Sequence, residues 1–305
     1  PVTMVEFLLG LATFCSLVIF LKVLCMYTAL HPNCRFLMIS LALALLLLTS
    51  SYMMELTAVV RNITLPERGD VVNHPFLRNV WFLHETAYAL SSLLMFCLTI
   101  ERLYACLTAR DYVNLHKFHP ITVVGLVLSM SGSLTFGYFI HFRNIHIPTT
   151  SFINSFELGS LILAVITLYW SRRKYREMIP NDLSYRYQMD EVINLTACIL
   201  PAIIMGVVFK LSAMIFVWLM IFTDRDPIGF SEIVSVYGFF FPWIVMARHH
   251  RMRAHLIHVL TCGDASDREA RKAADKLTRR VSTDEYFKAL NQELDLKIPK
   301  SPSCV

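Results

Sequence analysis

The sequence has few charged residues for its length. Asp, Glu, Lys and Arg make up 17% of the 305 residues, while apolar residues make up 55%. An ordinary soluble domain has about 25% charged and about 45–50% apolar residues. This shortage of charge argues against a water-soluble protein and makes a membrane protein the first class to test. The net charge of +5 is typical of basic cytoplasmic loops in a membrane protein, so it does not indicate nucleic-acid binding.

Cysteine motifs are also missing. None of the eight cysteines lies in a CxxC motif or in the Cys/His spacing of a zinc site. We therefore expect no metal, no other cofactor and no disulfide scaffold. The chain begins at Pro1 rather than Met, so we expect a further N-terminal segment, with any signal peptide, to precede it.

Seven apolar segments are long enough, or nearly so, to cross a bilayer, which takes roughly 20 residues of helix. They are Met4–Leu30, Phe36–Val60, Val80–Cys106, Ile121–His141, Phe152–Trp170, Val192–Phe222 and Phe230–Ala247. The sixth is longer than one crossing needs, so we expect it to protrude or tilt. We interpret 61–79 and 171–190 as the two longer loops. The sequence predicts an all-α, seven-transmembrane helix bundle over residues 1–247.

The orientation follows from Lys and Arg in the loops, which concentrate on the cytoplasmic side. One set of loops carries twelve of these residues and the other set carries five. The richer set includes the C-terminal side of the seventh span, so the N-terminus is predicted outside and the C-terminus in the cytoplasm. The sequon Asn62-Ile63-Thr64 falls in an outside loop and makes Asn62 a glycosylation candidate.

The chain beyond the seventh span is basic and then polar. Residues 248–262, RHHRMRAHLIHVLTC, predict a short amphipathic helix lying on the inner leaflet beside anionic lipid. Cys262 at its end is either a palmitoylation site or an unmodified cytosolic cysteine. Residues 263–305 have little to bury, so we expect a mobile tail. Within it, Ser282 follows two arginines and is a phosphorylation candidate.

Several functional classes have seven spans and an outside N-terminus. A retinal pump needs a Lys in the last span, and Phe230–Ala247 has none. A membrane metallohydrolase needs clustered His and Asp, yet the spans contain only His84 and His141 and no Asp. A transporter often shows related halves, and no internal repeat is present. A receptor needs no catalytic set, so we expect a receptor rather than an enzyme.

Ionisable residues inside the spans mark the candidate ligand site. Such a group costs about 2.5–3.5 kcal/mol at mid-bilayer, so it should face the bundle interior and be paired. Lys210 lies in the sixth span, and its possible partners or co-ligands in the outer half are Glu55, His84, Glu85, Glu157 and Glu232. These residues either line a ligand pocket or form a structural salt bridge, or Lys210 snorkels toward the surface.

One feature is shared loosely with rhodopsin-like receptors, and two of their usual features are absent. Glu101-Arg102, at the inner end of the third span, occupies the place of their acidic–Arg–aromatic motif, although Leu103 replaces the aromatic residue. The seventh span has Phe241-Pro242-Trp243 in place of Asn-Pro-x-x-Tyr, and the usual cysteine pair of that family is absent. The chain is therefore not a standard rhodopsin-like receptor.

The nearer resemblance is to the nematode serpentine chemoreceptors of the Sra superfamily, with the Sre type favoured over the Srab type. It rests on ERLYA at 101–105, on Asp111-Tyr112 and on LSYRYQMDE at 183–191. Asp190-Glu191-Val192 departs from the Glu-Asn that such receptors show there. The resemblance implies a G-protein-coupled receptor for environmental chemicals, located in the plasma membrane or the ciliary membrane of a sensory neuron.

The resemblance also implies a two-state mechanism, in which a small-molecule ligand shifts the balance between states of the bundle. Arg102 would be held in the inactive state by Glu101 or by Glu191, and Pro201 and Pro242 would kink the sixth and seventh spans. The alternative for Arg102 is an anchor at the membrane boundary. The residues expected to contact a heterotrimeric G protein are Arg110, Arg172, Arg173, Lys174, Arg176 and Arg186. The alternative function is a chemosensory ligand-gated channel or transporter.

Overall fold

The computed structural model describes residues 2–27, 30–60, 75–109, 120–143, 145–177, 183–223 and 230–260. No strand occurs within these ranges. The helices are α1 (Val2–Met26), α2 (Pro32–Val60), α3 (Pro75–Leu107), α5 (Pro120–Arg143), α6 (His146–Glu177), α7 (Leu183–Thr223), α8 (Phe230–Arg248) and α9 (His250–Leu260). Three of them begin at a proline, which is favoured at the first helical position because its missing N–H would be unpaired there in any case.

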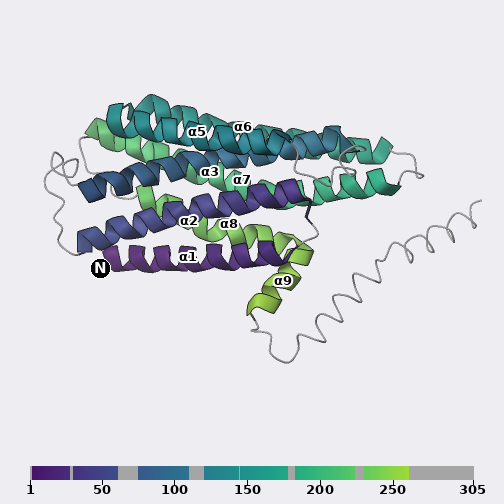
Figure 1. Ribbon diagram of the computed structural model, residues 1–305, viewed down its shortest axis with the longest axis horizontal. Coiled ribbons are helices and arrows are strands. Elements are labelled where there is room, and N and C mark those ends of the chain that lie inside the picture. The colour runs from purple at the N-terminus through teal and green to yellow at the C-terminus, as the bar shows by residue number, and fades with distance from the viewer. Residues whose placement is uncertain are drawn as a thin grey trace, which may run out of the picture. The chain divides into compact units, whose positions relative to one another are not determined.

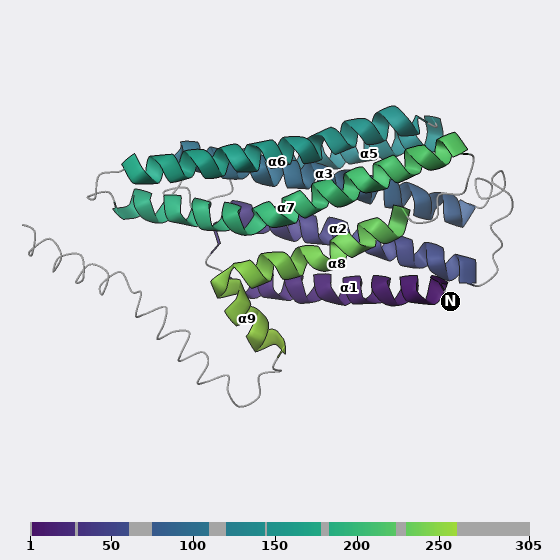
Figure 2. The same cartoon turned by 180° about the vertical axis from the view of Figure 1, so that it is seen from behind.

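Six of these helices are long and apolar enough to cross a membrane, and the part of α8 whose side chains are described, Val236–Arg248, is apolar but shorter. Together with α8 they form the predicted seven-transmembrane bundle, so this prediction is confirmed. The long helices lie side by side in both views (Figures 1 and 2). Helix α3 is central and contacts α2, α5, α6 and α7, while α8 connects α7 to α1. We call the end of the bundle where α3 ends, which is predicted to be cytoplasmic, the inner end.

The predicted loop 171–190 is wrong over most of its length. Helix α6 continues to Glu177 and α7 begins at Leu183, because a polar, charged sequence ends an apolar span without ending a helix. An i,i+4 pair supports the extension of α6, where Arg173 Nε donates to Glu177 Oε1 at 2.9 Å. Helix α7, with 41 residues, is about 60 Å long at 1.5 Å per residue, so it protrudes beyond the membrane as expected. The other predicted loop, 61–79, ends where α3 begins at Pro75.

The chain divides into two units, Pro1–Leu256 and Ile257–Val305. The first holds all seven long helices and most of α9, and the second contributes only residues 257–260 to the described part. Helix α9 confirms the predicted amphipathic helix with narrower bounds. Within the first unit, the ring of His255 on α9 lies 5.6 Å from that of Tyr27, which follows α1, and His249 lies 5.4 Å from the same ring.

Helix α5 packs closely against α3 through small residues. Gly125, Ser129, Ser133 and Gly137 recur every fourth position and therefore share one face of the helix. A Cβ atom added to Gly125 would lie 3.3 Å from Cys97 Sγ, and one added to Gly137 would clash with the Thr86 hydroxyl. Small residues let membrane helices approach each other closely. Inside a bilayer this close packing drives helix association, because the surrounding lipid is as apolar as the side chains.

Replacing Gly137 by Leu should separate α5 from α3 and destabilise the bundle by about 1–3 kcal/mol, the usual cost of overpacking. The measurement is the melting temperature of the purified protein in detergent. Thr135→Leu is the matched control, because Thr135 lies on the same helix with an exposed side chain. Equal melting temperatures for the two variants would contradict the close packing at Gly137.

Candidate functional site

The charged pair at the inner end of α3 is buried and bidentate. Arg102 donates from Nε to Glu101 Oε2 and from Nη2 to Glu101 Oε1, each at 2.5 Å. Both side chains are only 2% exposed, so Arg102 does not extend to the solvent at the membrane boundary. A buried charge is tolerated only when it is paired and hydrogen-bonded. Two parallel charge-assisted bonds hold this guanidinium in one orientation.

Residues of α6 and α7 complete the surroundings of Arg102. It lines a cavity of about 10 Å³ together with Ala164 of α6 and with Thr196 and Ile199 of α7. The Thr196 hydroxyl is buried and has no hydrogen-bond partner among the described residues. A hydrogen-bonding group of α7 is therefore available beside the guanidinium, which is paired within α3.

The other acidic residue expected to hold Arg102 lies at the same end of the bundle. Glu191 on α7 is half-buried, and its Oε1 accepts a hydrogen bond from the backbone N–H of His31 at 3.3 Å. Cys34 at the start of α2 lies within electrostatic range of Glu101, Arg102 and Glu191. The structure thus pairs Arg102 with Glu101, while Glu191 ties α7 to the connection between α1 and α2.

A second buried ion pair and its hydrogen bonds join three helices in the middle of the bundle. Lys210 on α7 pairs with Glu157 on α6, and its Nζ donates to Ser92 Oγ on α3 at 2.8 Å and to Ser91 Oγ at 3.2 Å. Lys210 and Glu157 are each 1% exposed. Of the alternatives for Lys210, the geometry supports the structural salt bridge rather than a side chain that snorkels to the surface.

Aromatic rings enclose this pair. Lys210 Nζ lies 5.3 Å from the ring centre of Tyr88 on α3 and 5.6 Å from that of Tyr237 on α8, both within cation–π range. The Tyr88 hydroxyl donates to Asn154 Oδ1 at 2.8 Å. Glu157 Oε2 and Asn154 Nδ2 are buried without a hydrogen-bond partner among the described residues. The network therefore keeps unused hydrogen-bonding capacity on α6.

The remaining ligand-binding candidates lie between α2 and α3. Glu55 Oε1 accepts a hydrogen bond from Trp81 Nε1 at 2.9 Å, and Ser51 Oγ lies 3.3 Å from His84 Nδ1. Glu85 is half-buried. Glu232 belongs to α8, but its side chain lies outside the described residues. The structure therefore separates the candidates into a Lys210–Glu157 network and an α2–α3 group.

Both proline positions lie within continuous helices, Pro201 in α7 and Pro242 in α8. Each proline removes one backbone donor, and neighbouring groups often satisfy the freed carbonyls in membrane helices. Ser16 Oγ of α1 donates to the Phe239 carbonyl at 3.2 Å, in the turn that precedes Pro242. This bond joins α8 to α1 one turn before Pro242.

The basic residues of the inner end fall into two groups. Arg172, Arg173 and Arg176 are exposed on the extension of α6. Lys174 instead donates to the Cys106 carbonyl at 3.2 Å, in the last turn of α3, and the Arg186 guanidinium lies 5.4 Å from the ring centre of Tyr175. The first group is exposed to solvent, with Arg173 paired to Glu177, whereas Lys174 and Arg186 contact other residues of the bundle. The predicted positions Asn62, Arg110, Cys262 and Ser282 lie outside the described residues.

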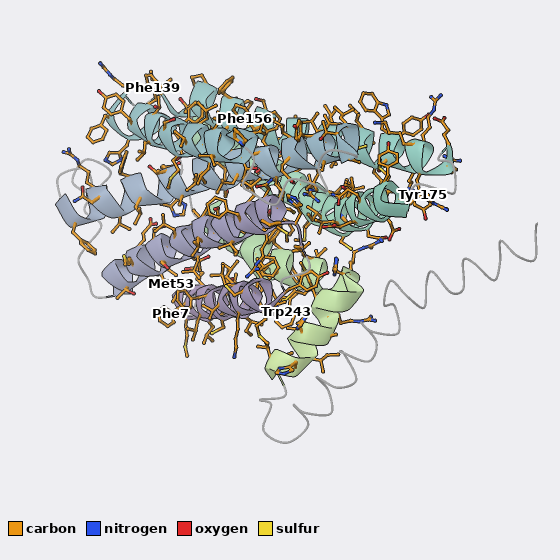
Figure 3. The ribbon with its side chains drawn as sticks, turned by 45° about the vertical axis from the view of Figure 1, so that its right-hand side comes forward. Phe7, Met53, Phe139, Phe156, Tyr175 and Trp243 are labelled. Atoms are coloured by element: carbon orange, nitrogen blue, oxygen red, sulfur yellow. The ribbon has the colours of Figure 1, made fainter. Side chains whose placement is uncertain are left out.

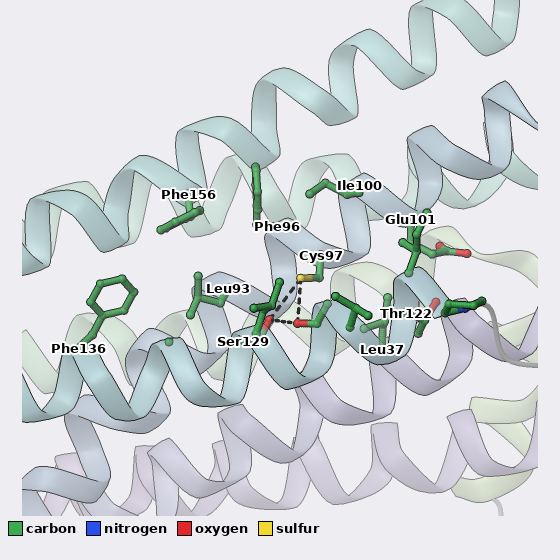
Figure 4. A pocket seen from close by; sticks show the side chains of 16 residues that line it. Leu37, Leu93, Phe96, Cys97, Ile100, Glu101, Thr122, Ser129, Phe136 and Phe156 are labelled. Carbon is green, nitrogen blue, oxygen red and sulfur yellow. Dashed lines mark hydrogen bonds between the residues drawn. The ribbon is translucent and has the colours of Figure 1, made fainter.

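A cavity beside α3 and α5 was not anticipated from the sequence. It has a volume of about 570 Å³ and lies along α3, α5 and α6, with Glu101 and Leu37 at one end and Phe136 and Phe156 at the other (Figure 4). The small-residue repeat on α5 was the signal that could have revealed it, because small side chains leave space beside a neighbouring helix. None of the candidate ligand-binding residues lines this cavity.

Seven apolar helices enclosing buried ion pairs define a multi-pass membrane protein with a receptor-like architecture. The family model described as Sre G protein-coupled chemoreceptor matches residues 74–295, well over half of the chain. The chain belongs to the Sre family of serpentine chemoreceptors. This confirms the Sre type predicted from the sequence and places the protein in a receptor family rather than an enzyme family. A search of curated proteins found no significant match.

Proposed function

We propose that the protein lies in the plasma membrane, including that of sensory cilia, where it binds an extracellular small molecule and activates a heterotrimeric G protein. The observation that carries this proposal is membership of the Sre family over residues 74–295. The buried Glu101–Arg102 pair at the inner end of α3 supports it. A buried charge that loses its partner is strongly destabilised. Arg102 is therefore stable only when it is paired, which suits an element that changes between two discrete arrangements.

The inner end would switch by exchanging partners of Arg102. In the resting state Glu101 holds the guanidinium within α3. A movement of the inner end of α7, with Pro201 as its weak point, would reshape the small cavity beside Arg102 and let the guanidinium exchange Glu101 for Thr196. A ligand can drive this change only by its differential affinity for the two states.

The ligand would bind between the outer halves of the membrane-spanning helices. The residues assigned to it are Glu55, His84, Glu85, Glu157, Lys210 and Glu232. Because the Lys210 network contacts α3, α6, α7 and α8, a ligand that disturbs it changes the packing of all four helices. The network thereby links ligand binding to movement of α7.

The exposed arginines on the extension of α6 would dock the G protein. Replacing Arg172, Arg173 and Arg176 together by Ala should lower G-protein activation about 10-fold, since rim charges mainly accelerate association. The measurement is ligand-independent or ligand-evoked nucleotide exchange at equal surface expression, at two salt concentrations. Arg253→Ala, an exposed arginine on α9, is the control. Unchanged exchange in the triple variant would remove these residues from the G-protein contact.

A chemical screen in cells that express a promiscuous G protein tests the receptor function itself. We expect at least one small molecule to evoke a second-messenger response that untransfected cells lack. The alternative, a ligand-gated channel or transporter, predicts a ligand-evoked current that persists when G-protein signalling is blocked. A persistent current would reject the proposal in favour of that alternative.

A further inference from the structure

The cavity between α3, α5 and α6 borders the lipid-facing surface of the bundle. Three of the α5 residues that line it, Ile121, Val124 and Leu128, are 39%, 55% and 63% exposed. Along α5 it extends from Pro120 to Phe136, which is about 24 Å at 1.5 Å per residue. A cavity of about 570 Å³ with this length accepts one elongated apolar molecule from the bilayer.

The inner end of the cavity offers one unused polar group. Thr122, in the first turn of α5, is 2% exposed, and its hydroxyl has no hydrogen-bond partner among the described residues. Thr122 and Glu101 both line the cavity, at the same end (Figure 4). The other polar groups in the wall are already bonded: Glu101 to Arg102, and the Cys97 thiol to Ser129 at 3.2 Å. A buried hydroxyl without a partner is costly, so a ligand hydroxyl that meets Thr122 is favoured.

The charges at the cavity exclude a phospholipid headgroup. No Lys, Arg or His is among the described residues that line it, so a phosphate would find no countercharge. The Glu101 carboxylate in the wall is already paired with Arg102. These observations favour a neutral lipid with a hydroxyl at one end.

The shape of the wall favours a flat, rigid body over a single chain. Gly125 and Gly132 line the cavity and present no side chain, so this part of α5 is smooth. Three aromatic rings, from Phe96, Phe136 and Phe156, line the part remote from Thr122. Smooth and aromatic surfaces give a ring system extensive contact at little entropic cost, because few torsions are immobilised.

We propose that this cavity binds a membrane sterol, with the sterol hydroxyl hydrogen-bonded to Thr122 and the fused rings lying along Gly125 and Gly132. The hydroxyl then lies at the membrane boundary where α5 begins, and the apolar tail reaches Phe136 and Phe156. The site is distinct from the ligand-binding residues assigned above. Its occupancy does not depend on which chemical the receptor detects.

The test is photolabelling of the full-length protein in lipid nanodiscs with a diazirine-bearing sterol, followed by peptide mass spectrometry. We expect labels on α3 and α5 around the cavity, which excess unlabelled sterol removes and excess phosphatidylcholine or diacylglycerol does not. Labels spread over several lipid-facing helices, or equal competition by a glycerolipid, would overturn the proposal.

Three variants sharpen the test. Thr122→Val keeps the shape but removes the hydroxyl, and it should weaken sterol competition about three- to tenfold, the value of one hydrogen bond. Leu128→Trp should fill the cavity and abolish labelling. Val127→Trp is the matched control, since Val127 is the preceding residue, is 59% exposed and does not line the cavity. Melting temperatures confirm that each variant is folded, and unchanged labelling in both Thr122→Val and Leu128→Trp would overturn the sterol site.

Discussion

Lys210→Met should destabilise the folded bundle by about 3–5 kcal/mol, the usual cost of removing one partner from a buried ion pair. The change leaves the Glu157 carboxylate 1% exposed with no cation beside it, and the Ser91 and Ser92 hydroxyls lose their donor. The melting temperature of the purified protein in detergent measures the effect. Lys22→Met on α1 is the matched control because the Lys22 side chain is exposed.

The double variant Lys210→Met/Glu157→Leu separates the free energy of the Lys210–Glu157 interaction from the effect of changing each residue alone. Replacing both partners of a buried pair by apolar residues of similar volume is often neutral or stabilising. We therefore expect the double variant to recover most of the stability that either single change loses, which is a positive coupling in a double-mutant cycle. Strictly additive losses would contradict the interpretation of Lys210 and Glu157 as an interacting pair.

The same cycle also separates structure from ligand recognition. If Lys210 only holds the bundle together, the double variant should bind and respond to the ligand as the parent does. If Lys210 also contacts the ligand, the double variant should be stable yet lose the response. The structure establishes the pair, and this comparison decides its second role.

The seven spans could be predicted from the sequence because a bilayer imposes a length of apolar helix that is visible in one segment at a time. The extents of α6 and α7 could not. Both helices continue into polar sequence, and the pairs that support them there, such as Asn194 with Asp190 at 2.8 Å, resemble any charged loop when read as sequence. Hydropathy marks where the membrane ends, and it does not mark where the helix ends.

The sequence predicted that ionisable residues inside the spans are paired, but it did not predict which residues pair with each other. Lys210 stood out because an ionisable group inside a span needs a partner, but four acidic residues were available to it. The choice of Glu157 depends on which faces of α6 and α7 meet, and one sequence carries no information on that rotation. Glu55 was an equal candidate, but in the structure it accepts a hydrogen bond from Trp81 instead.

Glu101→Gln should raise ligand-independent G-protein activation, and Arg102→Ala should abolish activation by the ligand. Hydrogen bonds to a charged group contribute about 1.5–3 kcal/mol, so weakening the resting pair should change the ratio of the two states about 10-fold or more. Basal and ligand-evoked nucleotide exchange, measured at equal surface expression, report the two effects. Lys22→Met again supplies an exposed-charge control.

Two conservative variants distinguish a switch from a structural pair. Glu101→Asp keeps the charge on a shorter side chain, and Arg102→Lys keeps the charge without the two-pronged geometry of the guanidinium. A switch predicts graded basal activity, with Glu101→Asp between the parent and Glu101→Gln, whatever the order of their melting temperatures. A purely structural pair predicts that activity falls only as far as the melting temperature does. Unimpaired coupling in Arg102→Ala would reject the switch, because Arg102 is the group whose change of partner the mechanism requires.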